Sequence, residues 1–388
     1  MRTRGTGAQG HGGTAWPCVG AALVLALLSG CGGDTPTEWE TPPERPLPAG
    51  MLRGADISAL ERIEQAGGVF RDAGRAGDAI AILRAHGANA FRLRLFVNPD
   101  HTEVQVNDLD YTVRMAVRIK AAGAKLLLDF HYSDTWADPG RQTTPSAWAA
   151  LPFDSLEHQV EVYSADVIAR LKQAGALPDI VQVGNEVDAG MLWPLGRVGG
   201  SDDTPAQWDR FTRLLKAGIR GVRSALGPAD TVRILLHYSQ GASSGGTQWF
   251  FDHLDTYGVP YDIIGLSYYP WWHGQPAYLR NNLDATVLRY GRDVMVVETT
   301  FPWRAGGVDA SAPYAAALAW PVSPQGQARF LNDVLDAVAA LPGGRGAGVL
   351  WWYPEAIDVS GLFVWGGGSL ALFDAGGNLL PAAAAFGR

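Results

Sequence analysis

Residues 180–186 read IVQVGNE, an apolar run that stops in an amide and a carboxylate. Residues 294–300 read VMVVETT and repeat the pattern, with four apolar residues followed by a glutamate. Short apolar runs bounded by polar residues are typical of strands buried in a parallel sheet, because both faces of such a sheet are covered. The two stretches therefore predict strands that end in Glu186 and Glu298.

Outward from these runs, short apolar segments alternate with longer segments of helical periodicity from residue 51 to the end. We predict strands at residues 53–57, 90–96, 125–130, 180–184, 232–237, 263–268, 294–297 and 348–352. Helical segments precede several of them, at residues 77–86, 110–122, 155–174 and 204–225. Alternation of this kind is the pattern of repeated βα units.

Eight such alternations over about 300 residues, without an internal linker, favour one barrel over a chain of smaller domains. A doubly wound open sheet would need a glycine-rich phosphate turn after its first strand, and the sequence has none. We therefore predict an α/β fold, a single (β/α)8 TIM barrel that forms the catalytic domain over residues 51–388.

Composition excludes several classes of protein. The chain has 388 residues, of which 47% are hydrophobic and 18% charged, so it can bury a large core and is not a disordered polymer. Its formal net charge of -8, with no basic stripe, argues against nucleic-acid binding. The 14 tryptophans point weakly to carbohydrate, since flat aromatic rings stack on sugar rings.

The N-terminal residues have the features of an export signal. Arg2 and Arg4 precede an apolar run at residues 19–28, which is too short to span a bilayer. The run ends in LSGC, residues 28–31, which resembles the bacterial lipobox. We therefore predict a lipoprotein signal peptide at residues 1–30 and a lipidated Cys31; the alternative is an ordinary signal cleaved nearby, with a free Cys31 thiol.

Residues 31–50 are rich in proline and acidic residues, a composition typical of an extended, solvated tether. We expect a cell-envelope lipoprotein, in the outer membrane or at the cell surface, that contacts membrane only through its lipid anchor. If the lipobox is not used, we expect a secreted protein. The cysteines, Cys18 and Cys31, both lie in this N-terminal part, so the barrel needs no disulfide or thiolate metal site.

Glu186 and Glu298 are the candidate catalytic pair. In a barrel the chemistry lies at the C-terminal ends of the strands. The fourth and seventh strands lie on opposite walls, so the two carboxylates can converge across the mouth. Hydrolysis of a glycosidic bond with retention needs two carboxyl groups about 5–5.5 Å apart, a nucleophile and an acid/base.

Other polar and aromatic side chains also fall at or just after strand ends. Arg92 and Arg94 share one face of the second strand by its period of two, and one of them could keep a carboxylate ionised. The remaining candidates are Asn185, His131, Trp136, Asp138, His237, Tyr268, Tyr269, Trp271 and Trp352.

With these residues in place, the chain resembles glycoside hydrolase family 53, the endo-β-1,4-galactanases, over nearly all of residues 51–381. The resemblance rests on RGADIS at 53–58, RLR at 92–94 and on through Asn98 and Pro99, HYSDTWADP at 131–139, GNE at 184–186, SYYP at 267–270, VET at 297–299 and ALFD at 371–374.

The resemblance implies a role for each glutamate. Glu186 would be the general acid/base and Glu298 the nucleophile, with Asn185 bonded to the sugar hydroxyl beside the reacting carbon. Tyr268 and Arg92 would hold Glu298 ionised. Glu186 must begin protonated, so we expect its pKa to be raised toward about 6–7 by apolar surroundings and by the charge on Glu298.

The resemblance also implies binding roles at the mouth. His131 and His237 would donate hydrogen bonds there, and Trp352 would stack under the sugar at the point of cleavage. Trp136 and Trp271 are candidates for flanking subsites.

Two departures from the family pattern are visible. Some bacterial members carry an acidic calcium loop after the seventh strand, but here residues 301–309 offer one carboxylate where calcium takes six to eight oxygens. Tyr353 stands where relatives often carry glutamate, with no consequence that the sequence predicts. His131, Asp134 and Asp138 read as a hydrogen-bonded turn. We therefore expect no metal and no cofactor.

The sequence thus predicts a retaining endo-β-1,4-galactanase that acts on the galactan side chains of pectin by double displacement, as a monomer. Two alternatives stay open. One is a related endo-glycanase or exo-galactosidase, because the glutamates fix the reaction but not the sugar. The other is a non-catalytic, glycan-binding surface lipoprotein, against which the presence of both glutamates argues.

Overall fold

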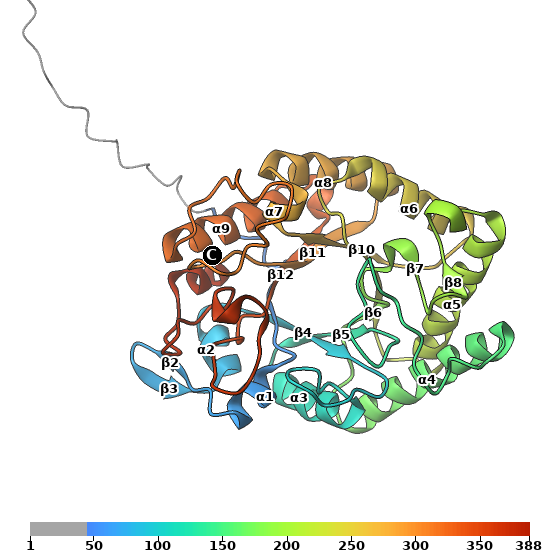
Figure 1. Ribbon diagram of the computed structural model, residues 1–388, viewed down its shortest axis with the longest axis horizontal. Helices are drawn as coiled ribbons and strands as arrows, with labels where there is room; N and C mark the ends of the chain where they lie inside the picture. Colours follow the sequence, from blue (N-terminus) through green and yellow to red (C-terminus); the bar gives the residue numbers. More distant parts are fainter. Residues whose placement is uncertain (1–44) are drawn as a thin grey trace, which may run out of the picture. The chain divides into compact units, whose positions relative to one another are not determined.

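Eight parallel strands close a barrel, and β12 pairs with β1 to complete it (Figure 1). The computed structural model describes residues 45–388. The strands are, in barrel order, β1 (Leu52–Asp56), β4 (Ala90–Leu95), β5 (Lys125–Phe130), β6 (Ile180–Val183), β9 (Arg233–Tyr238), β10 (Ile263–Tyr268), β11 (Asp293–Thr299) and β12 (Gly346–Trp352). Each predicted strand is present, within a few residues of its predicted ends, and the predicted (β/α)8 fold is confirmed.

Helices surround the barrel in Figure 1. They are α1 (Leu60–Gln65), α2 (Ala79–Ala85), α3 (Leu109–Ala121), α4 (Phe153–Gln173), α5 (Pro205–Ser224), α6 (Ser244–Thr256), α7 (Pro270–His273), α8 (Pro276–Tyr290) and α9 (Pro324–Ala339). The chain also contains short 3-10 turns, at Val187–Ala189, Gly200–Asp202, Pro342–Gly344, Trp365–Gly368 and Pro381–Gly387. Two small hairpins, β2 (Phe70–Asp72) with β3 (Arg75–Gly77) and β7 (Gly190–Met191) with β8 (Gly196–Arg197), lie outside the barrel sheet.

The strands separate two apolar layers because their side chains alternate. On β5, Leu126 and Leu128 belong to the large core between sheet and helices, whereas Leu127 belongs to a smaller cluster. That cluster also takes one or two residues from other strands: Ala90, Ile180, Leu235, Ile263, Met295, Val297 and Leu350. The barrel interior is thus packed rather than open, and the next residues on the same strand faces lead up into the mouth.

The N-terminal boundary differs slightly from the predicted one. The compact unit begins at Arg45, Leu47 is buried, and a guanidinium nitrogen of Arg388 donates to the Arg45 carbonyl at 2.9 Å. Residues 45–50 therefore belong with the barrel. The predicted signal peptide, Cys31 and the rest of the tether lie outside the described residues. Between Arg45 and Arg388, no helix has the length and apolar character needed to cross a membrane.

Glu355, in the loop after β12, is a buried carboxyl outside the barrel mouth. One oxygen accepts a hydrogen bond from the Ala59 N–H at 2.8 Å, and the other has no partner among the described residues. Burial, and then the charge of Asp56, raise the pKa of Glu355 to about 8. Glu355 is therefore protonated in the folded protein at neutral pH, whereas an unfolded glutamate ionises near pH 4.3.

This difference predicts a pH dependence of stability. Between about pH 4.3 and pH 8 the folded state binds more protons at Glu355 than the unfolded state does. As the pH rises through this range, the free energy of unfolding therefore falls by up to about 1.4 kcal/mol per pH unit. Glu355→Gln should make this decline shallower in urea unfolding at pH 5 and pH 8. Asp166→Asn, which removes an exposed carboxyl from α4, is the control; equal declines in both variants would contradict the prediction.

Candidate active site

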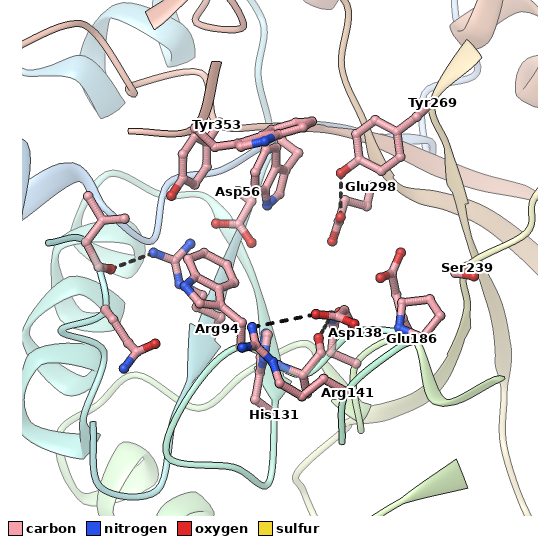
Figure 2. Close-up of a pocket in the computed structure, with 18 of the residues that line it drawn as sticks. Asp56, Arg94, His131, Asp138, Arg141, Glu186, Ser239, Tyr269, Glu298 and Tyr353 are labelled. Carbon is pink, nitrogen blue, oxygen red and sulfur yellow. Dashed lines mark hydrogen bonds and ion pairs between the residues drawn. The ribbon is translucent and has the colours of Figure 1, made fainter. Parts of the chain in front are cut away.

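The C-terminal end of the barrel opens into a cleft of about 740 Å³. Both predicted catalytic glutamates line it: Glu186 lies three residues after the end of β6, and Glu298 lies near the end of β11. Figure 2 shows the two carboxyl groups turned toward one another across the cleft. They are only 9% and 7% exposed, so their electrostatic interactions are weakly screened by water.

Arg92, on β4, holds the base of the cleft together and is 1% exposed. One terminal nitrogen donates to Asp56 and to Glu298 Oε2, each at 2.9 Å. The other donates to Asp129 at 2.8 Å and to Asn185 Oδ1 at 2.7 Å. Burial acts to lower the pKa of Arg92, yet the carboxylates raise it overall, so this residue is a permanent cation beside Glu298. The contact with Glu298 is the one expected from the sequence.

The tyrosine that bonds Glu298 is Tyr269, and the prediction of Tyr268 is wrong. The Tyr269 hydroxyl donates to Glu298 Oε1 at 2.5 Å, a contact drawn in Figure 2. Tyr268 faces the helices, where its ring stacks on Phe330 of α9, and its hydroxyl donates to the Gly274 carbonyl at 2.8 Å. The cause is the alternation along β10, which sends odd-numbered side chains into the barrel and even-numbered ones outward.

We predict that Tyr269→Phe lowers kcat by about 10- to 150-fold, because a hydrogen bond to a charged group contributes about 1.5–3 kcal/mol. The matched control is Tyr268→Phe, which removes the neighbouring hydroxyl but leaves Glu298 untouched, and should change kcat little. Steady-state rates of both purified variants on the same glycan would test this. Equal losses would contradict the assignment of Tyr269 to Glu298.

The surroundings of the two glutamates favour different protonation states. Burial raises the pKa of Glu186 well above its usual value, and the charges of Glu298 and Asp188 add to the rise. Burial also raises the pKa of Glu298, but Arg92 and the Tyr269 hydroxyl oppose that rise. These surroundings favour the proton on Glu186 and the charge on Glu298, the division that an acid and a nucleophile require.

Asn185 and the two predicted histidines support this arrangement from below and beside the cleft. Asn185 Nδ2 donates to the Ala137 carbonyl at 2.9 Å. His131 lines the cleft, where its Nδ1 accepts from the Ala137 N–H at 3.0 Å and its Nε2 lies 3.1 Å from Asp129. His237 is fully buried beneath Glu186 and does not line the cleft. The sequence analysis expected His237 to donate a hydrogen bond at the mouth. That expectation is wrong, because His237 cannot reach a sugar bound in the cleft.

Aromatic rings form one wall of the cleft. Trp352 is stacked on Tyr353, with ring centroids 3.9 Å apart and planes 12° apart, and both line the cleft. Trp136 also lines it, and the guanidinium of Arg94 lies 4.3 Å from its ring centre. Arg94 also donates to the Val104 carbonyl at 2.9 Å. Flat rings of this kind can stack on sugar faces.

The prediction of Trp271 as a subsite residue is wrong, and its neighbour takes that place. Trp271 is fully buried and is not part of the cleft lining, whereas Trp272 is 36% exposed and lines it. Trp272 stacks with Trp365 at 5.8 Å and 19°. Successive side chains on the single turn α7 point in directions about 100° apart, so a shift of one residue exchanges buried for exposed.

Asp138 lines the cleft as predicted, and lies 3.7 Å from Arg141 of the same loop. Cleft-lining or supporting residues that the sequence analysis did not single out include Asp56, Asp129, Gln182, Ser267, Trp272 and Trp365. Of these, Asp129, Gln182 and Ser267 continue the inward faces of β5, β6 and β10. That alternation was the signal that could have found them.

The sequence of the barrel matches a known family of enzymes. The family model described as "Glycosyl hydrolase family 53" matches residues 52–386. The chain belongs to family 53. It is a glycoside hydrolase, as the sequence predicted. The match spans nearly the whole barrel, including both glutamates.

Relatives and solved structures of similar length support membership of family 53. An uncharacterised protein in the bgaB 5′ region of Niallia circulans is 41% identical over 343 residues, which cover 85% of this chain and 92% of the relative. The arabinogalactan endo-β-1,4-galactanase of Thermothelomyces thermophilus is 33% identical, over 87% and 98%. The solved family 53 catalytic domain of Ignisphaera aggregans is 32% identical over 89% and 98%, with a TM-score of 0.80.

The side chains of this family 53 site can also be compared with the requirements of a metal ion. Within residues 45–388, no group of three or more His, Cys, Asp or Glu side chains is arranged to hold a metal ion. His131 and Asp134 accept hydrogen bonds from the main-chain N–H groups of Ala137 and Ser146. The expectation that no metal or cofactor is needed stays a prediction.

Proposed function

We propose that this family 53 enzyme is a retaining endo-β-1,4-galactanase, with Glu298 as the nucleophile and Glu186 as the acid/base. The observation that carries the proposal is the unequal pair: Arg92 and Tyr269 donate to Glu298, whereas burial and neighbouring carboxylates favour a proton on Glu186. The name of the Thermothelomyces thermophilus relative supports galactan as the substrate.

In the first step, a carboxylate oxygen of Glu298 forms a bond to the anomeric carbon as the bond from that carbon to the glycosidic oxygen breaks. Glu186 transfers its proton to the departing oxygen, which leaves as a hydroxyl group. The product is a glycosyl ester of Glu298 and an ionised Glu186. The charge on Glu298 has then disappeared, so the repulsion that disfavoured ionisation of Glu186 is removed.

In the second step, Glu186 takes a proton from water as the water oxygen bonds to the anomeric carbon. The ester bond breaks, and Glu298 leaves as a carboxylate. Two inversions restore the original anomeric configuration, and both glutamates return to their starting states. Arg92 acts throughout by favouring negative charge on the Glu298 oxygens, which it does most strongly before and after the ester exists.

Digestion of unbranched β-1,4-galactan tests this proposal. We expect short and intermediate oligomers to appear early, with new reducing ends in the β configuration by ¹H NMR. Release of galactose alone at early times would instead favour an exo-galactosidase, and cleavage of mannan or xylan but not galactan would favour a related endo-glycanase. Binding of galactan without any cleavage would favour a glycan-binding protein.

We further propose that the enzyme is exported and attached to the cell envelope through a diacylated Cys31. The support is the sequence alone, namely the apolar run at 19–28 and the lipobox-like residues 28–31. Labelling of cells with a palmitate analogue should mark the wild-type protein and not a Cys31→Ser variant. Equal labelling of both would contradict the lipid anchor, and an unlabelled protein in the medium would indicate simple secretion.

A further inference from the structure

A second cavity adjoins the cleft on the side of Glu186. It lies between the loop after β5, the segment at residues 188–201 and α6, and we call it the side cavity. Its volume of about 430 Å³ is within the range of small-molecule sites. Pro139 lines both the cleft and the side cavity, so the two spaces are neighbours. Asp188, two residues after Glu186, also lines the side cavity.

Two half-buried tryptophans, Trp193 and Trp249, line the side cavity. The ring N–H of Trp193 donates to the Ala189 carbonyl at 2.8 Å, and its main-chain N–H donates to the Gln142 carbonyl at 2.8 Å. The ring of Trp249 packs edge-on against Trp208, with centroids 5.2 Å apart. Both rings are therefore held in place while part of each stays open, and flat aromatic rings of this kind can stack on sugar faces.

Polar groups of both kinds stand beside these rings. The Asp188 carboxyl accepts from the main-chain N–H of Ser239 at 2.7 Å and from the Ser239 hydroxyl. A carboxylate has about four acceptor positions, so some of them stay free. The guanidinium of Arg197 lies 4.5 Å from the ring centre of Trp193, and its Nε lies 3.4 Å from Asp202, which leaves other N–H groups free to donate. Paired acceptors and donors suit a neutral sugar, whose hydroxyls both accept and donate, better than they suit an anion.

The position of the side cavity relates it to one part of a bound glycan. In the barrel sheet β6 and β12 are four positions apart in a ring of eight strands, so they lie on opposite walls. Trp352 ends β12, whereas the segment at residues 188–201 follows β6; Figure 1 shows its hairpin β7–β8 beside α5, across the barrel from β12. Glu186 gives its proton to the oxygen that departs with the leaving part of the chain. That part therefore extends from the cleft past Glu186, away from Trp352 and toward the side cavity.

We propose that the side cavity binds the leaving part of a β-1,4-galactan chain, beyond the unit that receives the proton of Glu186. The inference rests on the proposed function, because it takes Glu186 as the acid. Contacts with remote sugar units can lower the barrier of the first step, since their binding energy helps to hold the reacting bond in place. The second step should not use the side cavity, because the leaving part has then departed.

Two variants at the rim of the side cavity test this proposal by kinetics. Ser201→Trp fills the cavity, and Arg197→Ala removes a donor; both side chains are exposed, so we expect both variants to fold. On unbranched β-1,4-galactan we expect kcat/KM to fall by about 3- to 10-fold for Arg197→Ala and at least as much for Ser201→Trp. On 2,4-dinitrophenyl β-galactobioside, which has no sugar on its leaving side, both variants should stay within about twofold of wild type.

The matched control is Arg210→Ala, which removes an exposed arginine of α5 that lines neither the cleft nor the side cavity. It should leave kcat/KM on both substrates within about twofold of wild type. Equal losses on galactan and on the aryl substrate in the rim variants would overturn the proposal. Galactan activity of Ser201→Trp equal to that of wild type would also overturn it.

A series of β-1,4-galacto-oligosaccharides shows where on the chain the side cavity acts. For wild type, kcat/KM should rise with chain length until the leaving part fills the side cavity. For Ser201→Trp the last part of this rise should be absent, while the values for the shortest oligosaccharides should match those of wild type. Curves of the same shape for both enzymes would contradict binding of the leaving part.

NMR tests binding without turnover. In Glu298→Gln, the indole N–H signals of Trp193 and Trp249, assigned by their loss in Trp193→Phe and Trp249→Phe, should shift when long galacto-oligosaccharides are added. The added substitution Ser201→Trp should suppress both shifts. Signals that stay unchanged while that of Trp352 shifts would overturn the proposal. If wild type cleaves no galactan, the proposed function fails, whereas the two indole signals still decide whether the side cavity binds this glycan.

Discussion

Glu298→Gln is expected to lower kcat on β-1,4-galactan by about 10⁵-fold or more, the scale on which loss of a nucleophile acts. Glutamine has almost the same shape: its amide oxygen can still accept from Arg92 and its NH2 group can donate to the Tyr269 hydroxyl oxygen, but the amide is a poor nucleophile. Galactan affinity should therefore stay within a few-fold of the wild type, as measured by calorimetry on the folded variant. Because glutamine occupies nearly the same volume as glutamate, we expect Glu298→Gln to keep the barrel fold.

Two comparisons make this result specific. Glu355→Gln replaces another buried carboxyl, outside the cleft, and should keep galactan turnover. Incubation with a 2-fluoro-galactosyl substrate should label wild type at Glu298 and leave Glu298→Gln unlabelled, as seen by mass spectrometry. Turnover of Glu298→Gln close to that of wild type would show that another residue is the nucleophile.

Glu186→Ala is expected to lower kcat/KM on galactan by about 10²- to 10⁴-fold, the usual contribution of a general acid. Hydrolysis of 2,4-dinitrophenyl β-galactobioside should keep a first step near the wild-type rate, because that leaving group needs no proton. The second step should be slow, since no base activates water. Azide should restore turnover, because it attacks the ester without a base.

The product of the azide reaction distinguishes the two glutamates. With Glu186→Ala, azide displaces Glu298 from the anomeric carbon of the glycosyl ester and gives a β-galactobiosyl azide. With Glu298→Ala, azide occupies the place of the missing nucleophile, displaces dinitrophenolate and gives an α-galactobiosyl azide. The reverse pairing of configuration and variant would contradict the assigned roles, and NMR of the isolated azides would decide it.

The barrel and its catalytic pair could be predicted from the sequence because both rest on local patterns. Apolar runs as short as residues 180–183 are recognisable as strands when helical segments separate them, and a glutamate within three residues of the end of such a run lies at the mouth. Arg92 followed from the same alternation. The N-terminal edge was harder to predict, since Leu47 is the single buried residue of residues 45–50 and their composition is otherwise typical of a tether.

Two of the misplaced site residues, Tyr268 and Trp271, are each one position from the residue that lines the cleft. Tyr268 and Tyr269 are identical in type, as are Trp271 and Trp272, so composition cannot separate them. For the tyrosines, counting by twos from Ile263, which lies in the barrel interior, gives Tyr269. For the tryptophans, the direction of each side chain depends on the residue at which α7 begins. The sequence of a four-residue helix does not identify that residue. The contact between Ser267 and Glu186 joins residues far apart in the sequence and depends on the tertiary arrangement of their strands.

The inward faces of the strands that fill the barrel floor also carry the catalytic machinery. On β4, for example, Ala90 of the interior cluster is followed two and four residues later by Arg92 and Arg94. The stacked Trp272 and Trp365, by contrast, come from segments that follow β10 and β12. A replacement of Arg92 or Arg94 by a residue of another size therefore disturbs the packed barrel itself, whereas a replacement of either tryptophan alters contacts outside the barrel sheet. For protein engineering, this architecture makes substrate range an adjustable property and the reaction a fixed one.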